Sequence, residues 1–248
     1  MKPLLSTALL SLALAAPLSA QTDLSDLTEA ERTAFRDEVR AYLLENPEVL
    51  MEAIGVLEQR QAEAQATAEA EMLASSMDEI VNDGYSFVGG NPDGDITLVE
   101  FLDYRCGYCK RAFPEVEQLL ESDGNIRFIV KEFPILGEQS VLASRFAVAA
   151  QQALGNEAYK VLHDTLMEFQ GEITEASLKR TAEALDLDGD AIWAMIDAPE
   201  VTEILQKNRA LGERLRIDGT PSFVIEDRMV RGYMTLDAME ALVADLRS

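Results

Sequence analysis

Cysteine and histidine are scarce in this chain, which has 2 Cys and 1 His among 248 residues. A closed structural zinc site normally takes four Cys or His ligands, so one chain of this composition cannot form it. Basic residues are also few, with 21 Lys and Arg against 45 Asp and Glu and a net charge of −24. This balance opposes binding to nucleic acid and to anionic membrane surfaces. No uninterrupted apolar stretch is long enough to cross a bilayer, so the pair of cysteines becomes the main candidate for chemistry.

The first 20 residues have the composition of a secretory signal peptide. Lys2 supplies positive charge, residues 4–16 are mostly apolar, and Ala20 offers a small residue at the expected cleavage position. Removal of residues 1–20 would leave an exported protein. The predicted location is the periplasm, an oxidising compartment that suits a thiol pair.

The two cysteines lie where a predicted strand meets a predicted helix. Residues 96–102 are apolar and β-rich, and residues 110–121 have apolar side chains at helical spacing. Between them, Cys106 and Cys109 form a Cys-Gly-Tyr-Cys motif. The first sulfur then lies beside the unpaired N–H groups of a helix start, which lower the pKa of a thiol. We predict a redox site in which Cys106 is the nucleophile and Cys109 the resolving thiol.

A structural disulfide is the main alternative for this pair. A bond between residues three apart closes a very small loop, for which the chain-entropy model gives only about 2 kcal/mol. Redox chemistry is therefore the favoured reading. The remaining soft ligands offer no metal site: His163 is interpreted as a surface or core residue, and the nine Met are scattered.

Residues 27–80 have a helical pattern that Asn46-Pro47 divides in two. The second helix begins with a short apolar seam, followed by residues 58–71, which have high helix propensity but almost nothing to bury. The seam consists of Leu50, Ile54 and Leu57. Such a helix is stable as a solvated spacer or against another chain, so we predict a self-association element joined to a stalk. A helix folded back on its own domain is the alternative.

The remaining pattern is β–α–β, a helical block, and then β–β–α after Gly219-Thr220-Pro221. Strands at residues 96–102 and 126–133 should be parallel, because a right-handed crossover joins them. This is an α/β thioredoxin topology with an inserted helical domain at about residues 138–216. We predict three parts: a signal peptide (1–20), an N-terminal helical segment (21–82) and a catalytic domain (83–248).

Residues 99–109, the Thr220-Pro221 pair and the helical insert resemble the DsbA-like thiol–disulfide oxidoreductases of the thioredoxin superfamily. Residues 27–50 resemble the amino-terminal region of its suppressor-of-copper-sensitivity protein C (ScsC) branch. The resemblance covers nearly all of the chain after residue 20. It implies no cofactor other than a redox-active Cys106–Cys109 disulfide.

The resemblance also implies roles for three further residues. Pro221 matches the family's cis-proline that faces the disulfide, and Thr220 would offer its backbone to an extended substrate. Glu100 matches a buried acid that relays protons to the resolving thiol. Its alternative role is as a structural partner of Lys131 on the neighbouring strand.

The Gly107-Tyr108 dipeptide and the threonine before the proline resemble periplasmic disulfide isomerases of the DsbC type. We therefore predict a disulfide isomerase or reductase that acts on unfolded or misfolded exported proteins. It would be kept reduced by a DsbD-like membrane thiol reductase and would form a trimer or dimer through its N-terminal helices. The alternatives are a dithiol oxidase of the DsbA type and a copper(I)-binding protein that uses the thiolates of Cys106 and Cys109.

Overall fold

The computed structural model describes residues 27–248, which form two compact units. The first ends at Gln61 and the second comprises Ala62–Ser248. The predicted signal peptide, residues 1–20, lies outside the described residues. Within residues 27–248, no helix has both the length and the apolar character needed to cross a membrane.

The first unit is made of helix α1 (Glu29–Glu45) and the beginning of helix α2 (Glu48–Val81). Thr28 caps α1 in a reciprocal arrangement, in which its hydroxyl accepts from the Glu31 N–H and the Glu31 carboxylate accepts from the Thr28 N–H. Asn46 ends α1, and α2 begins directly after Pro47. The predicted division of the N-terminal helices is confirmed.

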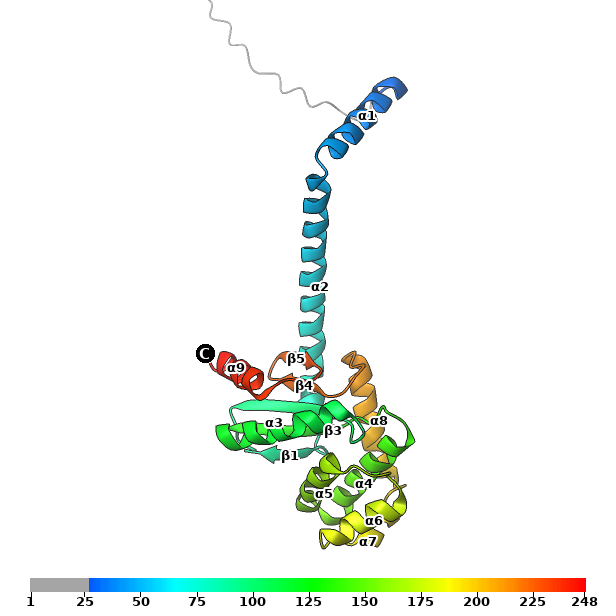
Figure 1. Ribbon diagram of the computed structural model, residues 1–248, viewed down its shortest axis with the longest axis vertical. Helices are drawn as coiled ribbons and strands as arrows, with labels where there is room; N and C mark the ends of the chain where they lie inside the picture. The colour runs from blue at the N-terminus through cyan, green and yellow to red at the C-terminus, as the bar shows by residue number, and fades with distance from the viewer. Residues whose placement is uncertain (1–26) are drawn as a thin grey trace, which may run out of the picture. The chain divides into compact units, whose positions relative to one another are not determined.

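A five-stranded sheet in the order β1-β3-β2-β4-β5 forms the centre of the second unit (Figure 1). Its strands are β1 (Phe87–Gly90), β2 (Ile96–Leu102), β3 (Ile126–Glu132), β4 (Ser222–Ile225) and β5 (Arg228–Arg231). Strands β2 and β3 are parallel, and the other three pairings are antiparallel. The predicted parallel pair is confirmed.

Seven helices follow α2 in the described chain: α3 (Gly107–Asp123), α4 (Glu138–Leu154), α5 (Asn156–Glu168), α6 (Glu175–Ala184), α7 (Gly189–Ala194), α8 (Pro199–Arg214) and α9 (Leu236–Leu246). Helices α4 to α8 are inserted between β3 and β4. With β2–α3–β3 before the insert and β4–β5–α9 after it, the second unit is a thioredoxin fold with an inserted helical domain, as predicted.

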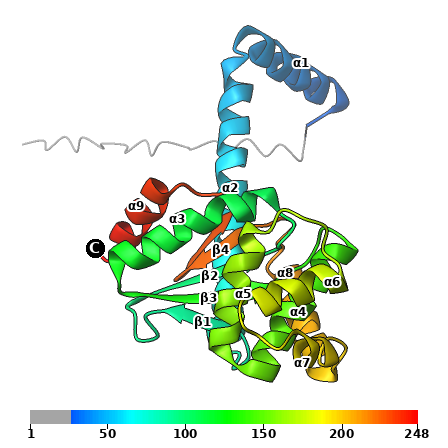
Figure 2. The same cartoon turned by 60° about the horizontal axis from the view of Figure 1, so that its bottom comes forward.

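The two faces of the sheet bury different helices, because neighbouring residues of a strand point to opposite sides. Leu98 and Leu102 of β2 belong to an apolar cluster with α3, α9 and the insert. Figure 2 shows α3 and α5 in front of the sheet that they cover. Val99 and Phe101 belong to a second cluster with the end of α2 and the last turns of α8. The near-continuous apolar pattern of β2 follows from this burial on both faces.

The end of α2 is part of the second unit and not only a linker. Leu73 and Ile80 are buried in the second cluster at 2% and 0% exposure. Lys131, whose side chain is fully buried, forms an ion pair with Asp83 and donates to the Glu79 carbonyl at 3.0 Å. The compact units therefore divide between Gln61 and Ala62, whereas the sequence placed the boundary at 82/83. The polar run 58–71 hid the short apolar segment that follows it.

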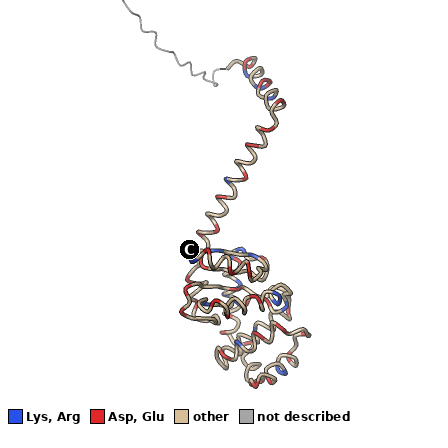
Figure 3. Tube along the Cα trace, turned by 60° about the vertical axis from the view of Figure 1, so that its left-hand side comes forward, with Lys and Arg blue, Asp and Glu red and all other residues tan. Residues whose placement is uncertain are grey.

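Acidic residues recur along both units, with Lys and Arg interspersed among them (Figure 3). The excess of acidic residues agrees with the net charge of −24.

Candidate active site at the start of helix α3

The loop between β2 and α3 is held by a buried carboxylate that sequence reasoning did not identify. Asp103 is 0% exposed and accepts hydrogen bonds from the backbone N–H groups of Arg105 (2.8 Å), Ile135 (2.8 Å) and Leu136 (3.0 Å). Its own carbonyl accepts from the Cys106 N–H at 3.0 Å. The only sequence signal was an Asp directly after a strand, where such residues commonly bond the backbone two positions on.

Cys106 is the N-cap residue of α3, as predicted, and Cys109 lies in the first turn. Both are free thiols; Cys106 is 7% exposed and Cys109 is 0% exposed. A hydrogen bond from the Cys109 thiol is the largest effect that lowers the pKa of Cys106, to about 5. Partial burial opposes the change, while the Thr220 side chain and the N–H groups of Cys109 and Tyr108 support it.

Cys109 is shifted in the opposite direction. Burial raises its pKa, and its hydrogen bond to Cys106 and the charge of Glu100 raise it further. One sulfur is thus a thiolate at neutral pH and the other is a protected thiol. This difference matches the nucleophile and the resolving thiol predicted from the motif.

The Thr220–Pro221 pair, far away in the sequence, lies directly beside the cysteines. Its peptide bond is cis, as the resemblance implied. The Cys106 sulfur lies 3.1 Å from the Thr220 carbonyl oxygen, to which the thiol donates. Only the protonated form of Cys106 can donate this hydrogen bond. Four of the five predicted site residues, Cys106, Cys109, Thr220 and Pro221, are therefore adjacent.

The fifth, Glu100, lies in β2 on the sheet face that carries the cysteines. It is 2% exposed, and its Oε1 atom has no hydrogen-bond partner in residues 27–248. Burial raises its pKa to about 8, with further contributions from the charges of Cys106 and Glu117. Glu100 and Lys131 do not pair, because Phe101 is the residue opposite Lys131 and consecutive strand residues face opposite sides. Lys131 pairs with Asp83 instead, so the structural alternative for Glu100 is wrong.

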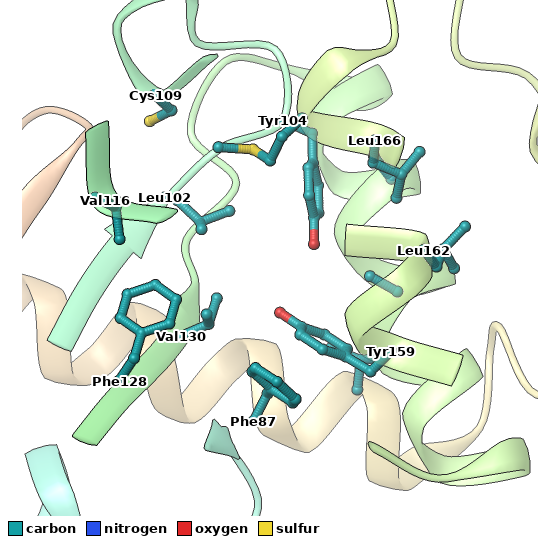
Figure 4. Close-up of a cluster of buried hydrophobic side chains, with 14 of the residues drawn as sticks. Phe87, Leu102, Tyr104, Cys109, Val116, Phe128, Val130, Tyr159, Leu162 and Leu166 are labelled. Carbon is teal, nitrogen blue, oxygen red and sulfur yellow. The ribbon is translucent and has the colours of Figure 1, made fainter. Parts of the chain in front are cut away.

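A buried polar cluster connects the active-site loop with the insert. The hydroxyls of Tyr104 and Tyr159 donate to the same Glu132 oxygen at 2.7 and 2.6 Å, and Figure 4 shows the two hydroxyls directed toward one another. His163 Nδ1 lies 3.0 Å from the Tyr104 hydroxyl. Burial lowers the pKa of His163 to about 3 and raises that of Glu132 to about 7. The histidine is therefore a neutral core residue, one of the two interpretations made from the sequence.

Lys110 makes a second connection between the active-site helix and the insert. Its ammonium donates to the carbonyls of Leu166 (3.0 Å), Met167 (3.0 Å) and Phe169 (2.6 Å) at the end of α5. Cations are favoured at this end of a helix because its last carbonyls lack intrahelical partners. Residues 27–248 contain no group of three or more His, Cys, Asp or Glu that could hold a metal ion.

Two family models match the chain. The DSBA-like thioredoxin domain matches residues 97–244, and the copper resistance protein ScsC N-terminal domain matches residues 31–64. Among solved structures, a thioredoxin-like oxidoreductase from Silicibacter pomeroyi is 40% identical with a TM-score of 0.65, over 68% of this chain and 96% of that one. Proteus mirabilis ScsC in a transitional conformation is 31% identical with a TM-score of 0.64, over 89% of this chain and 97% of that one.

Several curated relatives are much longer proteins. A Na⁺/H⁺ antiporter of Salinispora tropica is 30% identical over 156 residues, which are 63% of this chain but only 24% of the antiporter. The chain thus spans about a quarter of that relative. The first family model covers the strand, both cysteines, the insert and Thr220–Pro221. The chain belongs to the DSBA-like thioredoxin domain family, and it carries the N-terminal domain found in ScsC proteins.

Proposed function

We propose that the protein is a periplasmic thiol–disulfide isomerase or reductase of exported proteins. The observation that carries the proposal is the opposite shift of the two thiol pKa values, downward for Cys106 and upward for Cys109. The Cys106 thiolate would attack a client disulfide. That bond breaks, a mixed disulfide forms, and the second client sulfur leaves as a thiolate. No electrons are gained or lost overall in this exchange.

Two outcomes then follow from the mixed disulfide. If the released client thiolate attacks a different client disulfide, Cys106 is eventually expelled and the client has been rearranged. If Cys109 attacks first, its proton must leave, the Cys106–Cys109 disulfide forms, and the client is reduced. A buried, poorly acidic Cys109 makes the second route slower. This favours client rearrangement.

Glu100 is proposed to accept the proton of Cys109. Its pKa of about 8 lets it hold or release a proton near neutral pH, and its charge contributes to the raised pKa of Cys109. Burial without a hydrogen-bond partner for Oε1 leaves that oxygen available. Thr220 is proposed to bind the client backbone next to the sulfur that is attacked.

Assembly through the N-terminal helices supports the choice of isomerase. Apolar side chains on the first unit are 41–70% exposed: Phe35, Val39, Tyr42, Leu44, Leu50, Met51, Ile54, Val56 and Leu57. Helix α1 buries no residue at all. So many exposed apolar residues on two helices favour contact with further copies of the chain. A trimer or dimer would present several cysteine pairs to one client. A membrane thiol reductase would return oxidised Cys106–Cys109 to the dithiol.

Refolding of a client protein with scrambled disulfides tests the proposal. The reduced form of the present protein should restore the native disulfides of the client, and the Cys106→Ser variant should not. The Cys109→Ser variant should retain part of the rearranging activity. The potential of the Cys106–Cys109 couple is measured alongside against glutathione. Fast oxidation of a reduced client without correction of scrambled bonds would indicate the oxidase alternative.

Copper(I) binding is the second candidate, because the model that matches residues 31–64 is described as a copper resistance protein domain. The site fits copper(I) poorly: it offers two sulfurs, and burial keeps one of them protonated. Titration of the reduced protein and of Cys109→Ser with copper(I) tests this role. Weak or sub-stoichiometric binding excludes it.

A further inference from the structure

A pocket of about 240 Å³ lies between the active-site loop and the insert. Its lining includes Tyr104, Arg105, Lys110, Phe169 and Ile173. Arg105 immediately precedes Cys106, so a client held in this pocket is also held close to the attacking atom. We call it the cationic pocket, because Arg105 and Lys110 are the charged residues that line it.

The walls of the cationic pocket are tied together by two polar side chains. Gln139 Oε1 accepts from Arg105 Nη1 at 2.8 Å and from the Ile173 backbone N–H at 3.1 Å. Lys110 holds the Phe169 carbonyl at 2.6 Å from the opposite wall. These contacts fix the active-site loop and the 169–173 loop to each other, so the pocket is formed before a client arrives.

The two cations differ in what they can offer a ligand. The Lys110 ammonium already serves three carbonyls, whereas Arg105 donates one side-chain hydrogen bond and forms no ion pair with any residue from 27 to 248. A guanidinium carries five N–H donors in a planar fork that matches a carboxylate. Arg105 is exposed, and Gln139 orients it. Phe169 and Ile173 add apolar surface for the methylene groups of a side chain.

The positive charge of the cationic pocket contrasts with the negative charge of the whole chain. The whole chain carries −24, so its overall field repels acidic clients and attracts basic ones. We propose that the cationic pocket binds an Asp or Glu side chain of the client near its reacting cysteine, and that Arg105 makes this selection. The inference rests on the proposed thiol exchange and names the client chemistry that the exchange prefers.

Trapping of synthetic peptides tests the proposal. Each peptide has blocked ends and one Cys joined to 2-mercaptoethanol, and the residues near the Cys are Glu, Gln or Lys in otherwise identical peptides. With the Cys109→Ser protein, the Cys106 thiolate displaces mercaptoethanol as its thiolate, and the peptide adduct is followed by mass spectrometry. We expect the Glu peptide to react about fivefold faster than the Lys peptide at low salt, with a smaller ratio at high salt. The overall charge alone predicts the reverse order.

Three further substitutions in this background locate the effect. Arg105→Gln should reverse the ratio, Arg105→Lys should retain part of it, and Arg111→Gln should leave it unchanged. Arg111 is a matched control because it is an exposed arginine in the neighbouring helix α3, and its guanidinium lies over the Tyr233 ring and does not line the pocket. The Glu-to-Lys ratio cancels any change in the thiolate fraction of Cys106. A Glu peptide with a free C-terminal carboxylate, compared with its amide, separates a side-chain site from a chain-end site.

The outcomes are distinct. If the Lys peptide reacts as fast as the Glu peptide, or if Arg111→Gln changes the ratio as much as Arg105→Gln, the cationic pocket is not a client site. If no peptide reacts, including the neutral Gln peptide, thiol exchange itself is absent and the proposed function fails with the inference.

Discussion

At the scale of single residues, the chemistry depends on a proton shared between two sulfurs. The Cys109 thiol donates to Cys106, which stabilises the Cys106 thiolate and at the same time makes Cys109 harder to ionise. A shift of one pKa unit corresponds to about 1.4 kcal/mol of preference for one protonation state. The helix start contributes as well, through the Tyr108 and Cys109 N–H groups. Side-chain and backbone donors therefore act together on one atom.

Substitution of Cys109 separates these contributions. Cys109→Ala removes the donor with the largest effect, so the pKa of Cys106 should rise from about 5 toward the usual thiol value of 9. In Cys109→Ser a hydroxyl replaces the thiol, and the rise should be smaller. The pH dependence of Cys106 alkylation by iodoacetamide measures both. An unchanged pKa in Cys109→Ala would assign the acidity of Cys106 to the backbone alone.

Glu100 predicts a pH dependence of stability. Its pKa is raised from 4.5 to about 8 in the folded protein, so the folded state binds the proton more tightly than the unfolded state between these values. Stability should therefore be highest below about pH 4.5 as far as Glu100 is concerned, and should fall as the pH rises to about 8. Glu100→Gln cannot ionise, so its free energy of unfolding should not have this dependence on pH. The difference in free energy of unfolding between Glu100→Gln and the native protein should therefore shift in favour of the variant as the pH rises, by at most about 5 kcal/mol.

Urea unfolding of the reduced protein between pH 5 and 9 measures the Glu100 effect. Protein concentration is held constant, because assembly would add a concentration-dependent contribution. Glu121→Gln is the control, since it removes the same charge from an exposed position of α3. A parallel pH profile for Glu100→Gln and the native protein would show that Glu100 is ionised normally in the folded state.

At the scale of elements, local patterns predicted most of the fold. The apolar run of β2 and the Asn46-Pro47 break each depend on neighbours in the sequence, and the structure has both. Cys106 and Cys109 were identified for the same reason, because their motif is local. Thr220 and Pro221 were found through resemblance, since 114 residues separate Thr220 from Cys106.

What sequence reasoning missed depends on contacts between distant segments. Asp103 bonds residues 32 and 33 positions away, and the Tyr104–Glu132–Tyr159 cluster joins a loop, a strand and an insert helix. No local spacing marks these partners. Lys131, the alternative partner of Glu100, pairs with Asp83 because its side chain lies on the opposite face of the sheet from Glu100.

Substitution of Ile80 tests whether the end of α2 is part of the second unit. Ile80 is fully buried in the second apolar cluster. Ile80→Ala should therefore destabilise the second unit by about 2 to 5 kcal/mol, the usual cost of this substitution in a core. Val161→Ala, on the exposed surface of α5, should change stability by no more than about 0.5 kcal/mol. Urea unfolding followed by tryptophan fluorescence reports on the unit that holds Trp193. If Ile80→Ala lowered stability no more than Val161→Ala does, the end of α2 would not contribute to the stability of the second unit.

At the scale of the whole molecule, disulfide rearrangement and disulfide oxidation need different numbers of active sites around a client. Oxidation of a client requires one encounter with one cysteine pair. Rearrangement requires that a misfolded client stays in place while its sulfurs exchange. Several linked sites raise the effective concentration of each site around the client. The N-terminal helices matter to the reaction if they join chains, although they contribute no residue to the cysteine site.

Charge placed on the apolar surface of the first unit tests this dependence. Ile54 and Leu57 are 47% and 54% exposed, and Ile54→Glu/Leu57→Glu should reduce the mass measured by light scattering to that of one chain. The pKa of Cys106 and the oxidation of a reduced client should not change, whereas correction of scrambled disulfides should fall on the order of tenfold or more as linked sites are lost.

Val161→Glu places a similar charge on an exposed apolar residue of the insert and should leave both mass and activity unchanged. If the double variant becomes a single chain and still corrects scrambled disulfides at the native rate, assembly has no part in the reaction. In that case the lowered pKa of Cys106 and the raised pKa of Cys109 would be sufficient for disulfide rearrangement.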